Sequence, residues 1–309
     1  ATTTRTAVEA MMQMANISVN GSYIVPAEAL DKRIREVIAD WNFGDDPEAT
    51  KKREVQTIAA VQLGAMFYGH TDIDIQCHIA LYSYLLMLTD DSGVDVPTLA
   101  LEEFSTRLCA GMPQLHPVLT ALNDILSRMP DYYLPYASQS ILISTFQFIN
   151  ACAFERTTSS MTLHQDAAMF PEYKRVRSGI GEAYAFFAWD KFRFPDITAY
   201  VQVVPWFSQF VYPTSSDIFS FYKEELAGEE YNYIHDLSTV TGKDAGSVLI
   251  DVAQDVATFT RRSRAMLEGD ALLILEEFIR GFVFYHFVTP RYGVKRYLDV
   301  RMYIGEETH

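Results

Sequence analysis

The sequence contains two adjacent carboxylates near the end of a long apolar segment. Asp90 and Asp91 follow the apolar run 79–88, and Asp95 lies a few residues further on. If the run is a helix, these carboxylates lie at the negative end of its dipole, which costs free energy unless a cation compensates it. Mg²⁺ prefers oxygen ligands of this kind. An ordinary Asp-Ser-Gly turn that ends the helix is the alternative interpretation.

A second group of oxygen-bearing side chains occurs later in the chain. Ser216, Ser220 and Glu224 recur every fourth residue, with Lys223 beside the last of them. On an α-helix, residues with this spacing share one face, so two hydroxyls and a carboxylate could bind one hard cation. A solvated helix face with a Lys223–Glu224 pair also explains the segment, without a metal.

Both groups depend on helices to position them, and apolar residues recur with helical spacing along most of the chain. Strand-type alternation bounded by hairpin turns is absent, so we predict an all-α fold of about a dozen helices. A charged loop is predicted around Pro171. The clearest helices cover residues 27–41, 50–68, 72–89, 98–111, 117–128, 135–154, 214–227, 245–266 and 271–287, and another begins near Pro195.

Domain organisation is predicted from the distribution of polar and apolar segments. Residues 1–25 are polar and mixed, which predicts an N-terminal arm or disordered tail. Residues 26–309 contain no internal repeat and no low-complexity linker, so we predict a single domain there. The run 79–88 is apolar on nearly every side, as in a helix that is buried all round. Such helices could surround a cavity or simply form the core of a large protein.

Charge and composition exclude some partners. The 309 residues include 25 lysines and arginines against 40 acidic residues, a net charge of −15 that argues against a nucleic acid. An acidic protein that binds a diphosphate needs metal ions and placed cations to offset the repulsion. Three widely spaced cysteines without a CxxC pair favour a reducing, cytoplasmic location. Glu276, Glu277 and Arg280 interrupt the most apolar C-terminal segment, so no membrane span is predicted.

The two groups of oxygen ligands, in this order, resemble the two metal-binding motifs of class I terpene cyclases. These are the aspartate-rich motif and the Asn/Asp-x-x-Ser/Thr-x-x-x-Glu motif, and segment 217–224 is very similar to the trichodiene synthase family. The resemblance covers residues 30–297 and implies a class I terpenoid synthase helical bundle around a central active-site cavity. It assigns as metal ligands Asp90, Asp95, Ser216, Ser220 and Glu224.

Segment 170–181 is similar to the one in which this family holds a diphosphate-sensing arginine. The match implies Arg175 as the sensor, Ser178 as the linker and Gly179 as the residue at a helix break whose carbonyl faces the cavity. Asp91 is assigned to the same effector group. A solvated basic turn is the alternative interpretation of this segment.

Two other segments extend the resemblance. Residues 281–292 are similar to the family's last core helix and its Arg-Tyr pair, here Arg291 and Tyr292, although an arginine near a helix C-terminus could instead be a dipole partner. Within this helix, His286 is predicted to be a packed or capping residue. Residues 143–148 are similar to the helix that contributes a cavity aromatic, best matched by Phe148.

The resemblance implies a sesquiterpene synthase, a carbon–oxygen lyase that ionises farnesyl diphosphate and cyclises the resulting carbocation. The implied cofactor is Mg²⁺, as a trinuclear cluster in which Mn²⁺ can substitute. The implied diphosphate-binding residues are Arg175, Lys223, Arg291 and Tyr292. The predicted cavity walls, each of which could instead be plain core, are Phe148, Tyr285, Tyr84, Met87, Tyr212 and Phe67.

Two residues depart from the family pattern. Val94 stands where the family has a third acid, and Ser216 replaces the usual Asn or Asp. A weakly active or non-catalytic isoprenoid-binding relative is therefore an alternative. A chain-elongating prenyltransferase would need two aspartate-rich motifs, and the sequence has one. A cyclase that uses another prenyl diphosphate, and a homodimer, are left open.

Overall fold

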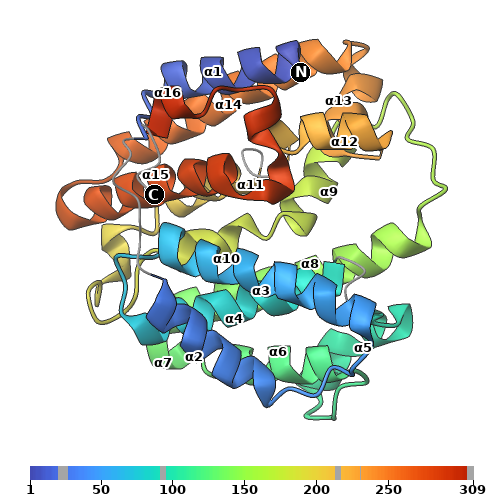
Figure 1. Cartoon of the computed structure of the whole chain (residues 1–309), viewed down its shortest axis with the longest axis vertical. Coiled ribbons are helices and arrows are strands. Elements are labelled where there is room, and N and C mark those ends of the chain that lie inside the picture. The colour runs from blue at the N-terminus through green and yellow to red at the C-terminus, as the bar shows by residue number, and fades with distance from the viewer. Residues whose placement is uncertain (20–26, 91–94, 213–216, 230, 305–309) are drawn as a thin grey trace. The chain divides into compact units, whose positions relative to one another are not determined.

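The computed structural model describes residues 1–19, 27–90, 95–212, 217–229 and 231–304. These residues form helices and turns with no β-strand among them, which confirms the all-α prediction (Figure 1). They divide into two compact units. Unit 1 holds the described residues of 1–24, 160–185 and 196–309, and unit 2 holds those of 25–159 and 186–195. The single domain over residues 26–309 stays a prediction.

Unit 2 is built around a helix that ends at the first predicted metal motif. This helix, α4, contacts α2, α3, α6 and α8. Every side chain from Cys77 to Leu86 is buried, which confirms that this apolar helix is covered on all sides. The helices of unit 2 are α2 (Glu28–Ala39), α3 (Pro47–Phe67), α4 (Ile73–Asp90), α5 (Thr98–Cys109), α6 (Pro117–Ser127), α7 (Met129–Tyr132) and α8 (Pro135–Thr157).

Small residues let α3 approach α4 closely. A Cβ atom placed on Gly64 of α3 would lie 3.0 Å from the Cβ atom of Ala80 and 3.1 Å from the carbonyl oxygen of Gln76. Contacts this short would force the two backbones apart, because packed interiors leave little room for displacement. Glycine at this position therefore lets α3 support the helix that carries Asp90.

His78 gives unit 2 a predicted sensitivity to acid. Its Nε2–H donates to the carbonyl oxygen of Ile125 in α6 at 2.9 Å, and burial lowers the pKa of the imidazole to about 4. Because the unfolded chain takes up this proton near pH 6.5 and the folded chain does not, the stability from His78 is fully present above pH 6.5. It is lost as the pH falls toward 4.

Replacing His78 by glutamine, which retains an N–H donor, should make unfolding less sensitive to pH. Between pH 7.5 and pH 5.5 the wild-type protein should lose about 1.3 kcal/mol more unfolding free energy than the variant. Urea unfolding of both proteins at the two pH values measures this difference. Equal losses in the two proteins would show that the imidazole takes up its proton without a penalty in the folded state.

Unit 1 packs its helices against α14. This helix contacts α1, α11 and α13, and Figure 1 shows α1 lying along it. Aromatic rings join α11 to α15, with centroids 4.7 Å apart for Phe207 and Phe278 and 5.4 Å apart for Phe210 and Phe282. The elements of unit 1 are α1 (Thr2–Ala15), α9 (Phe170–Ser178), α10 (Gly181–Phe186, whose last residue belongs to unit 2), η1 (Ile197–Ala199), α11 (Val204–Tyr212), α12 (Phe221–Ala227), α13 (Tyr233–Thr241), α14 (Ala245–Ala265), α15 (Gly269–Val288), η3 (Pro290–Tyr292), η4 (Val294–Arg296) and α16 (Arg301–Ile304).

Residues 2–15 of the predicted N-terminal arm form α1, so they are not a disordered tail. Ala7, Val8, Met11 and Ala15 are buried on one face of this helix. Arg264 of α14 donates to the carbonyl oxygen of Ala15 where α1 ends. The apolar residues of α1 recur with helical spacing, but several of them are alanines among polar residues, so the helical pattern is weak in the sequence.

Several other predicted boundaries are wrong. Pro171 lies in the first turn of α9 rather than in a loop, because a helix's first turn does not need the missing proline N–H. The short 3₁₀ turn η1 stands where a helix was predicted near Pro195, and α11 begins only at Val204. Within the predicted helix 214–227, the described α-helix α12 begins at Phe221. The helix α13 was not predicted.

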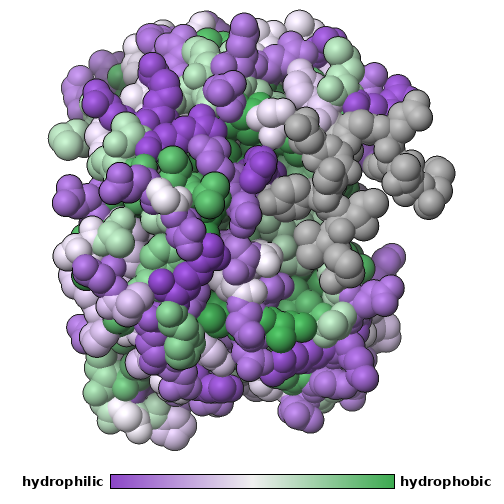
Figure 2. Space-filling model, turned by 90° about the vertical axis from the view of Figure 1, so that its left-hand side faces the viewer, coloured by the Kyte–Doolittle hydropathy of each residue, from purple (hydrophilic) through white to green (hydrophobic). Residues whose placement is uncertain are grey.

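No helix in the described part of the chain is both long enough and apolar enough to cross a membrane. Figure 2 shows one face of the molecule, on which hydrophilic side chains predominate and hydrophobic ones are scattered between them without forming a continuous band.

Candidate active site

The first predicted metal motif lies where α4 ends in unit 2. Asp90 is the last residue of α4, and its side chain is exposed. The Cys152 thiol of α8 donates to Oδ1 of Asp90 at an S···O distance of 3.9 Å. Burial, helped by the Asp90 charge, raises the pKa of Cys152, so the thiol keeps its proton. Asp95 is exposed before α5, and Asp91 lies outside the described residues.

A cation that the sequence analysis missed lies at the same helix end. Arg156 of α8 donates from Nη2 to the carbonyl oxygen of Thr89 at 2.8 Å and from Nη1 to that of Val96. This guanidinium offsets the negative end of the α4 dipole, a role that the sequence analysis assigned to a metal ion. Because Arg156 already compensates the α4 dipole, the dipole by itself does not require a metal ion at Asp90.

Replacing Arg156 by alanine should lower the free energy of unfolding by about 2 kcal/mol, because two hydrogen bonds from a charged donor are lost. Urea unfolding measures the change. Arg128→Ala is the control, since the ion pair of Arg128 with Asp131 is exposed at 3.6 Å and exposed pairs contribute little. Equal destabilisation by the two substitutions would contradict the role assigned to Arg156.

In unit 1 a buried ion pair joins the second predicted metal motif to α9. Arg175 donates from Nε to Oδ2 of Asp217 at 3.0 Å, and the two residues are 9% and 5% exposed. Burial raises the pKa of the Asp217 carboxyl to about 6, and the Arg175 guanidinium opposes that rise. Arg175 also donates from Nη1 to the hydroxyl of Ser178 at 3.5 Å. The predicted sensor and linker are thus in contact, and Asp217 is a partner that the sequence analysis did not assign.

The predicted ligands Ser220 and Glu224 lie side by side. The Ser220 hydroxyl donates to Oε1 of Glu224, and the Asn232 amide donates to Oε2 at 3.1 Å. Lys223 Nζ lies 4.0 Å from Oε1. Burial raises the pKa of Glu224, while the Ser220 hydrogen bond and the Lys223 charge oppose the rise. Ser216 lies outside the described residues.

Asn232 is a functional candidate that sequence reasoning missed. It precedes α13, where its Oδ1 accepts from the backbone N–H of His235 at 3.0 Å. Asparagine is a favoured helix N-cap, so recognising α13 in the sequence would have drawn attention to it. Its amide group then joins the start of α13 to Glu224.

The chain breaks between α9 and α10, where the resemblance placed Gly179. Gly179 itself has ordinary right-handed backbone angles, φ −80° and ψ −20°. Ile180 takes the unusual conformation instead, with φ 51°. A β-branched residue in the left-handed region is strained. The break occurs as predicted, but the strain belongs to Ile180, and the role of the Gly179 carbonyl stays a prediction.

His286 connects the second motif to the predicted Arg-Tyr pair. Its ring stacks on Phe219 with centroids 4.7 Å apart and lies 4.3 Å from the ring of Tyr292. Its Nδ1–H donates to the carbonyl oxygen of Phe282 at 2.7 Å. The prediction of a packed histidine is confirmed. Arg291 is exposed in η3, beside Tyr292.

The predicted cavity walls are mostly buried, as core residues would also be. In unit 2, Phe67, Tyr84 and Phe148 are buried and Met87 is half-buried. In unit 1, Tyr285 is buried with its ring 6.0 Å from that of Tyr292. The side chain of Tyr212 lies outside the described residues. Because burial does not separate a cavity wall from a core, these roles stay predictions.

Comparison with known proteins decides the family. The sequence model of the trichodiene synthase (TRI5) family matches residues 48–303. The chain belongs to the trichodiene synthase family. It is 35% identical over 269 residues to Monoterpene synthase 25 of Postia placenta, covering 86% of this chain and 79% of that protein. It is 29% identical over 271 residues to an (E)-beta farnesene synthase of Metarhizium brunneum, covering 85% and 81%.

A solved structure supports the same fold. The linalool/nerolidol synthase from Streptomyces clavuligerus, in complex with 2-fluorogeranyl diphosphate, matches this terpene synthase with a TM-score of 0.65. The match covers 87% of this chain and 99% of that one at 15% sequence identity, so it shows the shared fold alone.

The described residues of this terpene synthase do not by themselves identify the metal ligands. Among them, no group of three or more His, Cys, Asp or Glu side chains is arranged to hold a metal ion. The predicted ligand sets include serine hydroxyls, and Ser216 belongs to the part of the chain that is not described. Their assignment therefore stays a prediction.

Proposed function

We propose that this terpene synthase is a sesquiterpene synthase, a carbon–oxygen lyase that ionises farnesyl diphosphate with Mg²⁺ and cyclises the resulting carbocation. The observation that carries the proposal is a connected set of groups in unit 1. Arg175 donates a hydrogen bond to Asp217, and Ser220, three residues after Asp217, donates a hydrogen bond to Glu224. A cationic donor for a diphosphate and oxygen ligands for a metal therefore belong to one pair of packed segments.

The donor chemistry of the second motif fits Mg²⁺. Ser220 and Glu224 present a hydroxyl and a carboxylate side by side, and hard divalent cations prefer such oxygen ligands. Burial raises the pKa of Glu224, which means that its negative charge lacks full compensation within the protein. When bound, Mg²⁺ would supply charge neutralisation for the departing diphosphate. The proposed ligands are Asp90, Asp95, Ser216, Ser220 and Glu224.

Arg175, Lys223, Arg291 and Tyr292 are proposed to bind the diphosphate. Asp217 holds the Arg175 guanidinium in a fixed orientation through a 3.0 Å hydrogen bond in a buried environment. Donors that are oriented before the reaction need no reorganisation as negative charge develops on the leaving group. Asp217 is thus proposed to position Arg175 rather than to touch the substrate.

Aromatic side chains are proposed to protect the carbocation. Phe148 and Tyr285 are both buried, and burial raises the pKa of the Tyr285 phenol well above its usual value, so the ring stays neutral. A neutral aromatic face attracts a cation, and a wall of such rings excludes water that would otherwise trap it.

The chain length of the substrate is tested by direct competition. The relative at 35% identity is named a monoterpene synthase and the one at 29% a farnesene synthase, so geranyl diphosphate is the competing candidate. In an equimolar mixture with geranyl and geranylgeranyl diphosphates, we expect farnesyl diphosphate to be consumed at least about tenfold faster, because the cavity selects by fit. Faster loss of geranyl diphosphate would replace the sesquiterpene assignment by a monoterpene one.

A further inference from the structure

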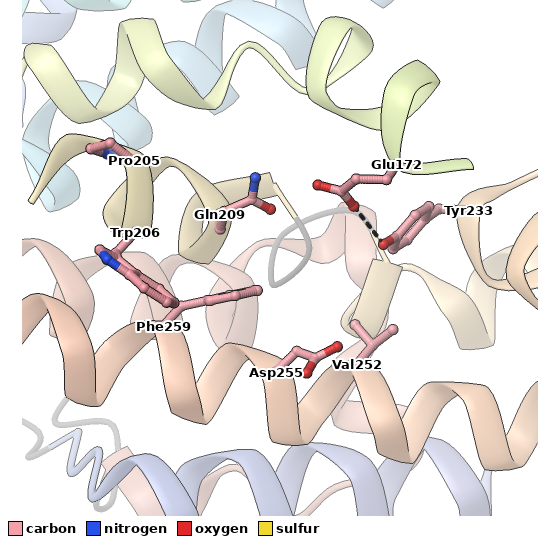
Figure 3. Close-up of a pocket in the computed structure, with 8 residues that line it drawn as sticks. All are labelled: Glu172, Pro205, Trp206, Gln209, Tyr233, Val252, Asp255 and Phe259. Carbon is pink, nitrogen blue, oxygen red and sulfur yellow. Dashed lines mark hydrogen bonds between the residues drawn. The ribbon is translucent and has the colours of Figure 1, made fainter. Parts of the chain in front are cut away.

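Unit 1 contains a pocket, and none of the described residues that line it is proposed to take part in the reaction. It has a volume of about 380 Å³ and lies among α9, α11, α13 and α14. Figure 3 shows Trp206 and Phe259 at one end, Glu172 and Tyr233 at the other, and Asp255 on α14 between Phe259 and Val252. Pockets of this size bind small organic molecules.

One end of the pocket is aromatic. The rings of Trp206 and Phe259 lie with their centroids 6.1 Å apart and their planes tilted by 47°. The guanidinium of Arg262 lies 5.9 Å from the centroid of the Trp206 ring, so the structure already places one cation over this indole. Indole faces attract cations more strongly than other aromatic side chains.

The other polar groups of the pocket make it negative. Glu172 of α9 accepts a hydrogen bond from the Tyr233 hydroxyl at 2.9 Å. Asp255 of α14 forms no hydrogen bond or ion pair with any other described residue. No lysine, arginine or histidine is among the described residues that line the pocket. Partial burial, with the charges of Asp251 and Glu172, raises the pKa of Asp255.

The neighbouring charges do not compensate Asp255. Lys243 is bound to Asp251 at 2.6 Å, Lys174 of α9 is paired with Asp236, and the guanidinium of Arg262 lies over the Trp206 ring. A bound cation would therefore relieve the repulsion between the carboxylates of α9 and α14, while a phosphate or carboxylate ligand would increase it.

We propose that this pocket binds a small organic cation of the ammonium type, whose apolar body packs on Trp206 and Phe259 and whose charge faces Asp255 and Glu172. Methylated ammonium groups suit such a site, because they combine a delocalised positive charge with an apolar surface. None of the described residues that line this pocket is proposed to bind the prenyl diphosphate, and the proposed ligand is a cation whereas the diphosphate is an anion. The proposed ligand is a free small molecule, small enough to fit a pocket of about 380 Å³.

Choline and 3,3-dimethylbutan-1-ol form a matched pair of probes, since they have nearly the same shape and differ in charge. Calorimetric titration of the full chain should show choline binding about tenfold more tightly than the neutral alcohol. Equal binding of the two probes, or no binding of choline at millimolar concentration, would overturn the proposal. The titration measures binding and not turnover. A negative titration would therefore not contradict the proposed terpene synthase reaction, and an absence of turnover would not contradict choline binding.

Two variants locate the binding. Asp255→Asn should weaken choline binding about fivefold and Trp206→Leu by a similar factor, as expected for a partly exposed carboxylate and an aromatic wall. Asp251→Asn is the matched control. Asp251 lies one turn away on the same helix, but it is already paired with Lys243, so its replacement should weaken choline binding much less than Asp255→Asn does. Normal binding in Asp255→Asn, or equal weakening in Asp251→Asn, would place the cation elsewhere and refute the site.

Discussion

Replacing Glu224 by glutamine should leave the protein folded and lower kcat/KM for farnesyl diphosphate roughly 100- to 1000-fold. The glutamine side chain has nearly the same shape and its carbonyl can still accept from the Ser220 hydroxyl, although its NH2 group can no longer accept from the Asn232 amide. What is lost is the carboxylate charge, which the proposed Mg²⁺ site needs. Because burial raises the pKa of Glu224, removing this charge should offset the loss of the Asn232 hydrogen bond and leave the metal-free protein folded.

The same variant separates metal binding from folding. Mg²⁺ with inorganic diphosphate should raise the thermal midpoint of the wild-type protein, and this rise should be lost in Glu224→Gln. Glu225→Gln is the matched control, since Glu225 is an exposed neighbour that pairs with His235 at 2.8 Å. The control should retain normal turnover and normal stabilisation. Near-normal turnover in Glu224→Gln would contradict the assignment of Glu224 as a metal ligand.

Replacing Arg175 by alanine should lower kcat/KM by a comparable factor of roughly 100 to 1000, because a preorganised donor to the leaving diphosphate is lost. It should also leave Asp217 buried without its partner. The pKa of Asp217 is already raised to about 6 in the folded protein. A carboxyl with a raised pKa contributes stability at low pH that is lost as the pH rises through the folded pKa. Arg175→Ala should therefore be less stable at pH 8 than at pH 5.

A double variant distinguishes the two consequences of losing Arg175. Adding Asp217→Asn to Arg175→Ala removes the buried charge, so it should restore stability at pH 8 but not turnover. Arg177→Ala is the control on the same helix, since Arg177 packs 3.5 Å over the Tyr173 ring and donates to the Tyr173 carbonyl oxygen. Recovery of turnover in the double variant would show that Arg175 acts only through the fold.

The sequence predicted the buried helices well because their signal is local. The run 79–88 is apolar on nearly every side, and α4 is indeed covered all round. The second motif was harder, because the spacing of Ser220 and Glu224 predicts one continuous helix. In the described residues, Asp217 and Ile218 take a π-helical conformation and α12 starts at Phe221. Local spacing cannot reveal such an interruption.

The partners of the candidate site belong to other helices than the motifs do, which explains why they were missed. Arg156 reaches the end of α4 from α8, and Asn232 reaches Glu224 from the start of α13. Neither residue belongs to a motif, and each is recognised only when two helices are packed together. The strained Ile180 was likewise hidden, because the neighbouring glycine was the more obvious residue for an unusual backbone conformation.

The most direct test of the central claim is incubation of the purified protein with farnesyl diphosphate and Mg²⁺, followed by gas chromatography and mass spectrometry of the organic extract. We expect a C15 hydrocarbon or alcohol that disappears when EDTA is added and returns when Mg²⁺ is restored in excess. A reaction mixture without any C15 product, or a product yield that EDTA leaves unchanged, would contradict the assignment of a Mg²⁺-dependent sesquiterpene synthase.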